Sequence, residues 1–342
     1  MTSAEWAERI VRRLNRGAAK PLVNGVFRGL QFLDGLQIAW SRPKWQVPAG
    51  REKDAIYQGP GPLVIGGTGG SGTRVLARAV RDAGCYLGDT VNIAHDCMAF
   101  TGMWGRPFNP EILKGLSGWM LRPDELHAAI SRYGQRETRR FSPAEKSALV
   151  DDILRRVAWL LRNRPTPDTP WGWKFPSSIL LLPILDEIFP AMRFIHLVRD
   201  GRDMAFSSNQ VALRGHGKAF LESESEGLPG PVRAAMLWNR VNMDAVSYGR
   251  AAMGERYLVV RFEDLCADPV RELSKIWTFM GFDAALSPEE AARSVAYGGK
   301  LGRWRTRADQ ELLRAVSASA EPGLRTFGYW PTPALSDTMP PR

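Results

Sequence analysis

Short, largely apolar runs alternate with helical patterns along most of this chain. Residues 63–65 (LVI), 193–198 (RFIHLV) and 257–261 (YLVVR) have the length and apolar character of buried strands. Apolar residues at helical spacing follow the first run, and Asp268-Pro269 begins a helical pattern that extends toward Met280. Strands that alternate with helices over this length predict an α/β fold, with a central parallel sheet flanked by helices.

Two segments depart from this alternation. Residues 1–58 carry an excess of Lys and Arg among apolar residues near helical spacing, and the GPGP run at 59–62 marks the end of this segment. Residues 101–165 are rich in Trp, Arg and Pro, and Ser142-Pro143 has the sequence of a helix start. We therefore predict a basic N-terminal helical extension at 1–58 and a single domain at 59–342, with a helical insert at about 101–165.

The composition excludes several classes of protein. The 342 residues are 44% hydrophobic and 24% charged, and apolar runs stay short of the roughly 18 residues that would span a membrane. The first residues lack the apolar core of a secretory signal. Cys85, Cys97 and Cys266 lie far apart, and the four histidines lack the spacing of metal ligands, so we expect neither a disulfide framework nor a metal site. These features favour a reducing, cytoplasmic location.

The formal net charge of +10 favours a polyanionic partner. Nucleic acid, an anionic membrane surface and a phosphate-bearing ligand would each meet that requirement. The chain lacks the RGG tracts, basic-aromatic repeats and zinc-finger spacing of nucleic-acid-binding proteins, so we expect no nucleic-acid partner. Residues 1–58 form either a helix packed on the domain or an element that contacts a membrane surface peripherally.

The glycine-rich segment after the first strand has the arrangement of an anion site. Residues 66–74 read GGTGGSGTR, and they connect the end of a strand to the start of a helix. Backbone N–H groups converge at such a helix N-terminus, and the helix dipole adds positive potential there. We therefore expect this loop to bind a phosphate group.

Three kinds of phosphate-binding loop match this segment in part, and a glycine turn without a ligand is a fourth interpretation. A Walker A loop requires a lysine where this chain has Thr73, which argues against a nucleoside triphosphatase. Gly67, Gly69 and Gly72 match the GxGxxG dinucleotide fingerprint, and Asp89 lies near the place of its ribose-binding acid. In the third interpretation, the Ser-Gly-Thr sequence of the loop surrounds a single 5′-phosphate.

Five segments, taken in order, resemble the bacterial type of the PAPS-dependent sulfotransferase family (PAPS is 3′-phosphoadenosine 5′-phosphosulfate). Residues 69–73 are similar to the family's 5′-phosphosulfate loop, and residues 194–207 (FIHLVRDGRDMAFS) to its 3′-phosphate strand, loop and helix. Residues 257–282 resemble the late strand and helix of bacterial members. Residues 299–305 (GKLGRWR) resemble the late loop that closes on the 3′-phosphate, and residues 327–331 (FGYWP) the usual terminal strand.

This resemblance implies the P-loop nucleotide-kinase-like fold of sulfotransferases. It also implies transfer of a sulfuryl group from PAPS to an acceptor hydroxyl or amine, with PAP as the product. Because PAPS carries phosphates on its 5′ and 3′ sides, a protein that binds it needs two anion sites, and arginine is well suited to the second. The implied PAPS-binding residues are Gly69, Gly70, Ser71, Gly72, Thr73, Arg74, Arg199, Ser207, Gly299, Lys300 and Arg303.

The implied chemistry is an in-line displacement at sulfur, for which positioning and neutralisation of charge matter most. Residues 173–176 (WKFP) resemble the family's K-x-P motif, whose lysine contacts the leaving phosphate, and this makes Lys174 the catalytic lysine. Family members often place an acid or a histidine after the first helix. Asp96 is therefore the first candidate for the general base and His95 the second, with helix capping as the competing role for Asp96.

The chain departs from the family's pattern in the glycine loop. Gly70 occupies a position where many members have Lys or Arg, and Arg74 is the candidate replacement for that charge. A nicotinamide-dependent oxidoreductase and a catalytically inactive nucleotide-binding module therefore stay as alternatives. The acceptor is open among carbohydrates, lipid-linked glycans, peptide tyrosines and small phenols, and the oligomeric state is open as well.

Three polar residues near the strand at 193–198 are assigned structural roles. We expect Arg202 and Asp203 to form an ion pair with each other. His196 alternates with buried strand residues, which favours a core histidine with its hydrogen bonds satisfied.

Overall fold

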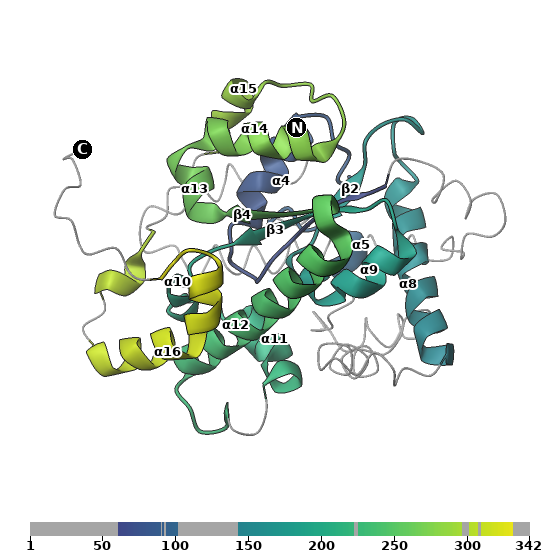
Figure 1. The fold of residues 1–342 in the computed structure, drawn as a ribbon. Helices are drawn as coiled ribbons and strands as arrows, with labels where there is room; N and C mark the ends of the chain where they lie inside the picture. Colours follow the sequence, from purple (N-terminus) through teal and green to yellow (C-terminus); the bar gives the residue numbers. More distant parts are fainter. Residues whose placement is uncertain are drawn as a thin grey trace, which may run out of the picture.

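A computed structural model describes residues 61–89, 91, 94–101, 143–221, 225–295, 301–306 and 309–330 (Figure 1). The expected extension at 1–58 and most of the expected insert lie outside the described residues, as do Gly299 and Lys300. Within the described residues, four strands form one parallel sheet in the order β2-β1-β3-β4, which confirms the predicted α/β fold. The strands are β1 (Leu63–Gly66), β2 (Gly172–Lys174), β3 (Arg193–Val198) and β4 (Tyr257–Arg261).

Helices connect the strands and cover both faces of the sheet (Figure 1). Between β1 and β2 lie α4 (Thr73–Asp82), α5 (Met98–Thr101) and α8 (Pro143–Leu161), and between β2 and β3 lie η4 (Pro176–Leu181) and α9 (Leu182–Ile188). The elements from β3 to β4 are α10 (Gly201–Ala205), α11 (Val211–Phe220), α12 (Gly230–Tyr248), η6 (Gly249–Met253) and η7 (Gly254–Arg256). After β4 come α13 (Phe262–Ala267), α14 (Pro269–Met280), α15 (Pro288–Ala292), η8 (Arg303–Thr306) and α16 (Gln310–Thr326). Among the described residues, each helix is too short or too polar to pass through a bilayer.

Side chains of the two central strands alternate between two hydrophobic cores. Ile65 of β1 and Ile195 of β3 pack in the core that includes α4 and α14, whereas Val64 and Phe194 pack in the core that includes α9 and α12. All four side chains are completely buried. Because helices cover both faces, these strands read as continuous apolar runs in the sequence.

The part of the expected insert that the structure describes, α8, belongs to the main core. Ile153, Leu154 and Val157 are completely buried and pack in the same core as Trp173 of β2. The buried Arg156 donates a hydrogen bond to a backbone carbonyl at the start of α5. This helix is therefore one wall of the domain.

The predicted start of α14 is confirmed, and the predicted terminal strand is wrong. Asp268 accepts a hydrogen bond from the N–H of Arg271, and Pro269 is the first residue of the helix. Residues 327–328 form a turn after α16, and residues 329–330 are irregular. Tyr329 donates its N–H to the carbonyl of Leu324, so its backbone completes the helix end and is not available to a sheet.

Candidate active site

The carboxyl ends of all four strands meet at one edge of the sheet, and the glycine loop, Lys174 and Arg199 lie there. The glycine loop follows β1, Lys174 ends β2, Arg199 follows β3 and Phe262 follows β4. Because β1 lies between β2 and β3, the glycine loop lies between Lys174 and Arg199 along this edge. Open parallel sheets bind their ligands outside the carboxyl ends of the strands. The topology thus brings together groups that are far apart in the sequence.

The glycine loop has the backbone and side-chain arrangement of an anion site. Gly70 and Gly72 have φ angles of 101° and 94°, in the left-handed region, and Gly72 is the N-cap of α4. The hydroxyls of Thr68 and Ser71 are buried without a hydrogen-bond partner among the described residues. Burying such a group unpaired costs about 1–3 kcal/mol. An oxyanion at the N-terminus of α4 would supply the acceptor, so the loop fits a phosphate group.

The end of α10 and the start of α11 lie beside this loop. A Cβ atom added to Gly70 would lie 3.3 Å from Cε of Met204, and one added to Gly69 would lie 3.8 Å from Cβ of Ala212. Gly70 therefore has little room for a longer side chain on that side. Thr73 is buried in the first turn of α4, and Arg74 beside it is exposed.

Lys174 is a buried cation that binds residues 94–97 through both its ammonium group and its backbone carbonyl. Its Nζ donates to Oδ1 of Asp96 at 2.5 Å and to the carbonyl of Ala94 at 2.7 Å. Its own carbonyl accepts the N–H of Cys97 at 2.8 Å. Burial lowers the pKa of Lys174, the neighbouring Asp96 carboxylate raises it, and the positive charge of Arg74 lowers it further. The structure thus places the predicted lysine, the first candidate base and Arg74 in one electrostatic neighbourhood.

The two candidate bases lie next to each other in different environments. The Asp96 side chain is 17% exposed, against 2% for the Lys174 side chain, so solvent reaches the carboxylate more than the ammonium. His95 has a φ angle of 57°, a conformation that is uncommon outside glycine. This left-handed residue turns the chain between Ala94 and Asp96, the two residues that accept from Lys174.

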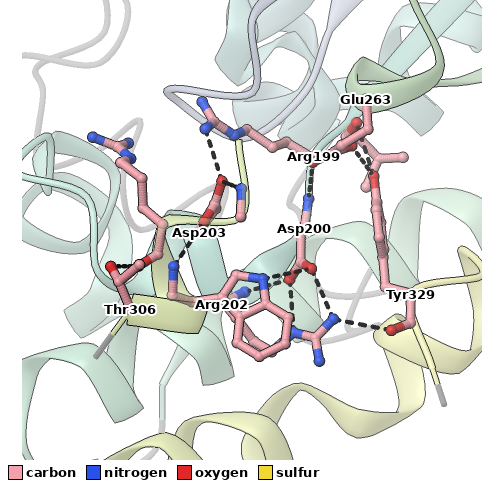
Figure 2. Close-up of polar contacts among 11 residues, drawn as sticks. Arg199, Asp200, Arg202, Asp203, Glu263, Thr306 and Tyr329 are labelled. Atoms are coloured by element: carbon pink, nitrogen blue, oxygen red, sulfur yellow. Dashed lines mark hydrogen bonds and ion pairs between the residues drawn. The ribbon is translucent and has the colours of Figure 1, made fainter. Parts of the chain in front are cut away.

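Arg199 forms an ion pair with Asp203 at 2.9 Å, and Arg202 pairs with Asp200 at 2.8 Å (Figure 2). The predicted pairing of Arg202 with Asp203 is therefore wrong. Asp200 is the N-cap of α10 and accepts the N–H of Arg202, which brings its carboxylate to the guanidinium of the same arginine. Asp203 lies one helical turn after Arg199 and faces it.

The late loop is bound to the start of α10. Asp203 accepts the N–H of Gly302 at 2.9 Å and that of Trp304 at 3.2 Å, and Asp200 accepts the indole N–H of Trp304 at 3.1 Å. Figure 2 shows these acids between the arginines and the loop. Arg303 begins η8 and is half-buried. The described part of this loop thus shares the Asp203 carboxylate with Arg199.

Ser207 lies after α10 and is half-buried. Its Oγ accepts the N–H of Asn209 at 3.1 Å, which leaves the hydroxyl proton for a further acceptor. The structure therefore places both members of the predicted Arg-Ser pair on the β3–α10 side of the glycine loop.

Phe262 is a site residue that the sequence did not indicate. Its ring centre lies 5.4 Å from the guanidinium carbon of Arg199, and a Cβ atom added to Gly72 would lie 2.3 Å from the same ring. The completely buried ring therefore packs beside both the glycine loop and the guanidinium of Arg199. The only sequence signal is its place directly after the late strand.

His216 is a second residue that the sequence did not indicate. Its Nε2 lies 3.4 Å from Oγ of Ser177, which follows the WKFP motif. Ala212, one turn earlier on α11, lies over Gly69 of the glycine loop. This histidine therefore lies next to the residue that follows the WKFP motif, at the same edge of the sheet.

The position of Asp89 argues against a dinucleotide site. The preceding Tyr86 pairs with Trp171, just before β2, and lies on the side of β2 that faces away from β1. A ribose-binding acid must lie at the end of the strand next to the glycine loop. Within the described residues, no cluster of His, Cys, Asp and Glu could hold a metal ion.

Comparisons with known proteins point to one family. A model of the sulfotransferase family matches residues 62–285. Human carbohydrate sulfotransferase 3 is 24% identical over 172 residues, which cover 44% of this chain and 36% of that protein. Mouse carbohydrate sulfotransferase 2 is 29% identical over 152 residues, which cover 35% of this chain and 28% of that protein, so the chain spans about a third of these relatives. The crystal structure of sulfotransferase STF1 from Mycobacterium tuberculosis aligns with a TM-score of 0.48 at 16% identity, over 93% of this chain and 91% of that chain.

Proposed function

Since this chain belongs to the sulfotransferase family, we propose that it transfers a sulfuryl group from PAPS to an acceptor hydroxyl or amine and releases PAP. One observation carries this proposal. The strand order places a buried lysine on one side of a phosphate-type loop and a buried arginine on the other. The glycine loop and Arg199 would be two separate anion sites, and Lys174 lies on the side of the loop away from Arg199.

The two anion sites divide the binding of PAPS between them. Residues 69–74 would hold the 5′-phosphosulfate with backbone N–H groups, the Ser71 hydroxyl and the Arg74 side chain. Arg199 and Ser207 would hold the 3′-phosphate. The late loop, with Gly299, Lys300 and Arg303 as the implied residues, would close on the same phosphate.

Lys174 would stabilise the charge that develops during transfer. The acceptor atom bonds to sulfur while the bond from sulfur to the bridging oxygen breaks, and the electron pair leaves with PAP. An ammonium at that oxygen is worth more in the transition state than in the ground state, because the negative charge on the oxygen increases as the bond loosens. The burial of Lys174 strengthens this interaction, since water screens it less.

The acceptor must lose a proton, and we propose Asp96 as the base, with His95 as the second candidate. Asp96 is bound to Lys174 at 2.5 Å, so the two groups act as a unit. When Lys174 turns to the bridging oxygen, the Asp96 carboxylate is released to take the proton of the acceptor. One movement would then prepare both the leaving group and the nucleophile.

For the acceptor, we propose a hydroxyl of a carbohydrate. Two relatives with partial coverage are carbohydrate sulfotransferases. Acidic glycans would also be attracted by the net charge of +10. Transfer of labelled sulfate from PAPS to a panel of glycans, phenols and tyrosine peptides would identify the acceptor class.

Ligand-dependent stability tests the PAPS-binding function. PAP should stabilise the protein against thermal unfolding, by about 2–4 kcal/mol at saturating concentration, whereas NAD and ATP should not. Arg199→Ala should weaken PAP by about 30-fold or more but leave adenosine 5′-phosphosulfate nearly unchanged, because only PAP carries the 3′-phosphate. Equal stabilisation by NAD and PAP would contradict the proposal.

We also propose that residues 1–58 contact an anionic membrane surface. The support is the excess of Lys and Arg among apolar residues near helical spacing. Co-sedimentation of the full chain and of residues 59–342 with anionic and neutral vesicles would test it. Binding of the full chain to anionic vesicles alone is the expected result, and equal binding by both forms would contradict it.

A further inference from the structure

We propose that Asp203 is a positioning residue for the 3′-phosphate, because its carboxylate connects Arg199 to the late loop. This inference rests on the proposed function and deepens it by adding an acid to an anion-binding site. The predicted contacts with the 3′-phosphate all come from arginine, lysine, serine and glycine. Asp203 would act through these groups and would not touch the phosphate itself.

The Asp203 carboxylate uses both oxygens to bind three donors. Oδ2 accepts from the guanidinium of Arg199 and from the N–H of Gly302, each at 2.9 Å, and Oδ1 accepts from the N–H of Trp304 at 3.2 Å. The Asp203 side chain is completely buried, and the Arg199 side chain is 6% exposed. A buried carboxylate is stable only when it is paired and hydrogen-bonded. Its three donors are therefore held together as a set.

The orientation of Arg199 depends on this acid and on the ring of Phe262. A guanidinium binds a phosphate well when its planar donors face the oxygens, so its orientation matters as much as its charge. Asp203 holds one end of the guanidinium by a charge-assisted hydrogen bond, and the ring centre of Phe262 lies 5.4 Å from its carbon atom. Without the carboxylate, Arg199 would keep its charge but lose this fixed direction.

The Asp203 carboxylate links the position of the late loop to the orientation of Arg199. A 3′-phosphate that orders Arg199 also orders the acid to which Gly302 and Trp304 are bound. By thermodynamic linkage, a loop held in place must raise the affinity for the 3′-phosphate by the same factor. PAP should therefore protect the loop more than adenosine 5′-phosphate, which differs from PAP only in the 3′-phosphate.

The neighbouring pair of Asp200 and Arg202 provides a matched comparison. Asp200 is also a buried acid at the start of α10 that binds an arginine and the late loop, through the indole of Trp304. Arg202 lies 3.8 Å from the ring centre of Trp304 and donates to the carbonyl of Tyr329. This pair fixes helix, loop and C-terminal turn, but its arginine is not the one assigned to the phosphate (Figure 2).

Calorimetric affinities for PAP and adenosine 5′-phosphate test the inference in the full chain, Asp203→Asn and Asp200→Asn. The wild type should prefer PAP, and Asp203→Asn should lower that preference about tenfold, through PAP alone. Asp200→Asn should lose stability but keep most of the preference, because it removes only the indole contact with the loop and leaves Arg199 bound to Asp203. An unchanged preference in Asp203→Asn, or an equal loss in both variants, would overturn the positioning role. A wild type without any preference for PAP would instead contradict the proposed function.

Amide hydrogen exchange in the wild type decides the question if Asp203→Asn does not fold. The amides of Gly302 and Trp304 are the donors to Asp203, so their exchange rates report that contact directly. Slower exchange with saturating PAP than with saturating adenosine 5′-phosphate is expected. Equal exchange with both nucleotides would overturn the inference, since the loop would then not respond to the 3′-phosphate.

Discussion

Lys174 and Arg199 are buried cations at the same edge of the sheet, and each is paired with an acid, but the two acids differ. The partner of Lys174 lies in the irregular segment 94–97, and its side chain is 17% exposed. The partner of Arg199 lies on α10, is completely buried and also holds two backbone N–H groups. The two acids thus differ in exposure to solvent, and the Asp203 carboxylate is bound by Arg199 and by two backbone N–H groups.

This difference matches the two tasks of the proposed reaction. The 3′-phosphate carries the same charge before and after transfer, so a rigid arginine recognises it best. The charge on the bridging oxygen develops only during transfer, so the lysine must be able to leave its resting partner. In the proposed reaction, a buried pair of cation and acid would thus serve recognition or chemistry according to how firmly its acid is held.

The largest expected effect comes from removing Lys174, the cation that is proposed to leave its acid during transfer. Lys174→Ala should reduce single-turnover transfer from labelled PAPS by about 10²–10³-fold, since a preorganised donor to the developing charge is lost. PAP affinity should stay within a few-fold of wild type, because Arg199 and the glycine loop are untouched. Lys174→Arg should restore little activity, since a planar guanidinium does not replace a compact ammonium. Near wild-type transfer by Lys174→Ala would remove the basis of the comparison.

The free energy of unfolding should decrease in acid, because β3, the strand before Arg199, carries a buried neutral histidine. His196 receives a hydrogen bond from Tyr257 and donates one to Asn242, and burial lowers its pKa from 6.5 to about 4. Its contribution to stability is complete above pH 6.5 and is lost as the pH falls toward about 4, because only the unfolded chain takes up the proton. The loss amounts to at most about 3 kcal/mol.

Denaturant unfolding between about pH 7 and pH 5 measures this loss. His196→Gln keeps a donor and an acceptor in the same strand, so it serves as the matched variant. Its free energy of unfolding should fall less steeply with pH than that of the wild type. Parallel curves for the two proteins would show that His196 does not make this strand acid-sensitive.

Asp96→Asn should lower turnover, because Asp96 is the proposed base, and it should also shift the pH dependence of the activity that is left. Burial lowers the pKa of Lys174 and Asp96 raises it. Asp96→Asn should therefore lower that pKa further, so the loss of activity at alkaline pH should begin at a lower pH than in the wild type. A kcat profile against pH would show this shift. An unmoved alkaline limb would mean that Asp96 does not control the charge of Lys174.

The smallest effect is expected from adding a positive charge to the glycine loop, which lies between Lys174 and Arg199. Gly70→Lys places the residue type found in many family members at a φ of 101° and against Met204. It should lower stability by about 1–2 kcal/mol without raising PAP affinity, because the left-handed backbone is strained for lysine. Gly69→Lys, where an added Cβ makes an ordinary contact at 3.8 Å, is the control. A large gain in PAP affinity from Gly70→Lys would show that the loop lacks a cation there.

Features carried by contiguous sequence could be predicted. The three long strands, the glycine loop and the start of α14 each depend on a short pattern, and all are found in the structure. Lys174 and Arg199 could be proposed as site residues because each belongs to a local motif, and the structure places Lys174 at the end of β2 and Arg199 directly after β3. The predicted core role of His196 is confirmed by its two hydrogen bonds.

Features that depend on the order of strands could not be predicted. The contact of Lys174 with Asp96 joins residues 78 positions apart, and the place of Phe262 depends on β4 lying next to β3. The pairing of Arg202 was predicted wrongly because the cap of α10 turns Asp200 toward it, a geometric effect with little trace in composition. Residue types indicate which side chains can form ion pairs, but the backbone geometry decides which of these side chains pair with each other.

Phe262 also limits how this protein can evolve. A side chain at position 72 would require a smaller residue at 262, because the added Cβ would lie 2.3 Å from the ring. A smaller residue at 262 would in turn remove the surface beside Arg199. A change at 262 that makes room for a side chain at 72 would therefore disturb the surroundings of Arg199. Glycine at 72 and phenylalanine at 262 should be inherited as a linked pair.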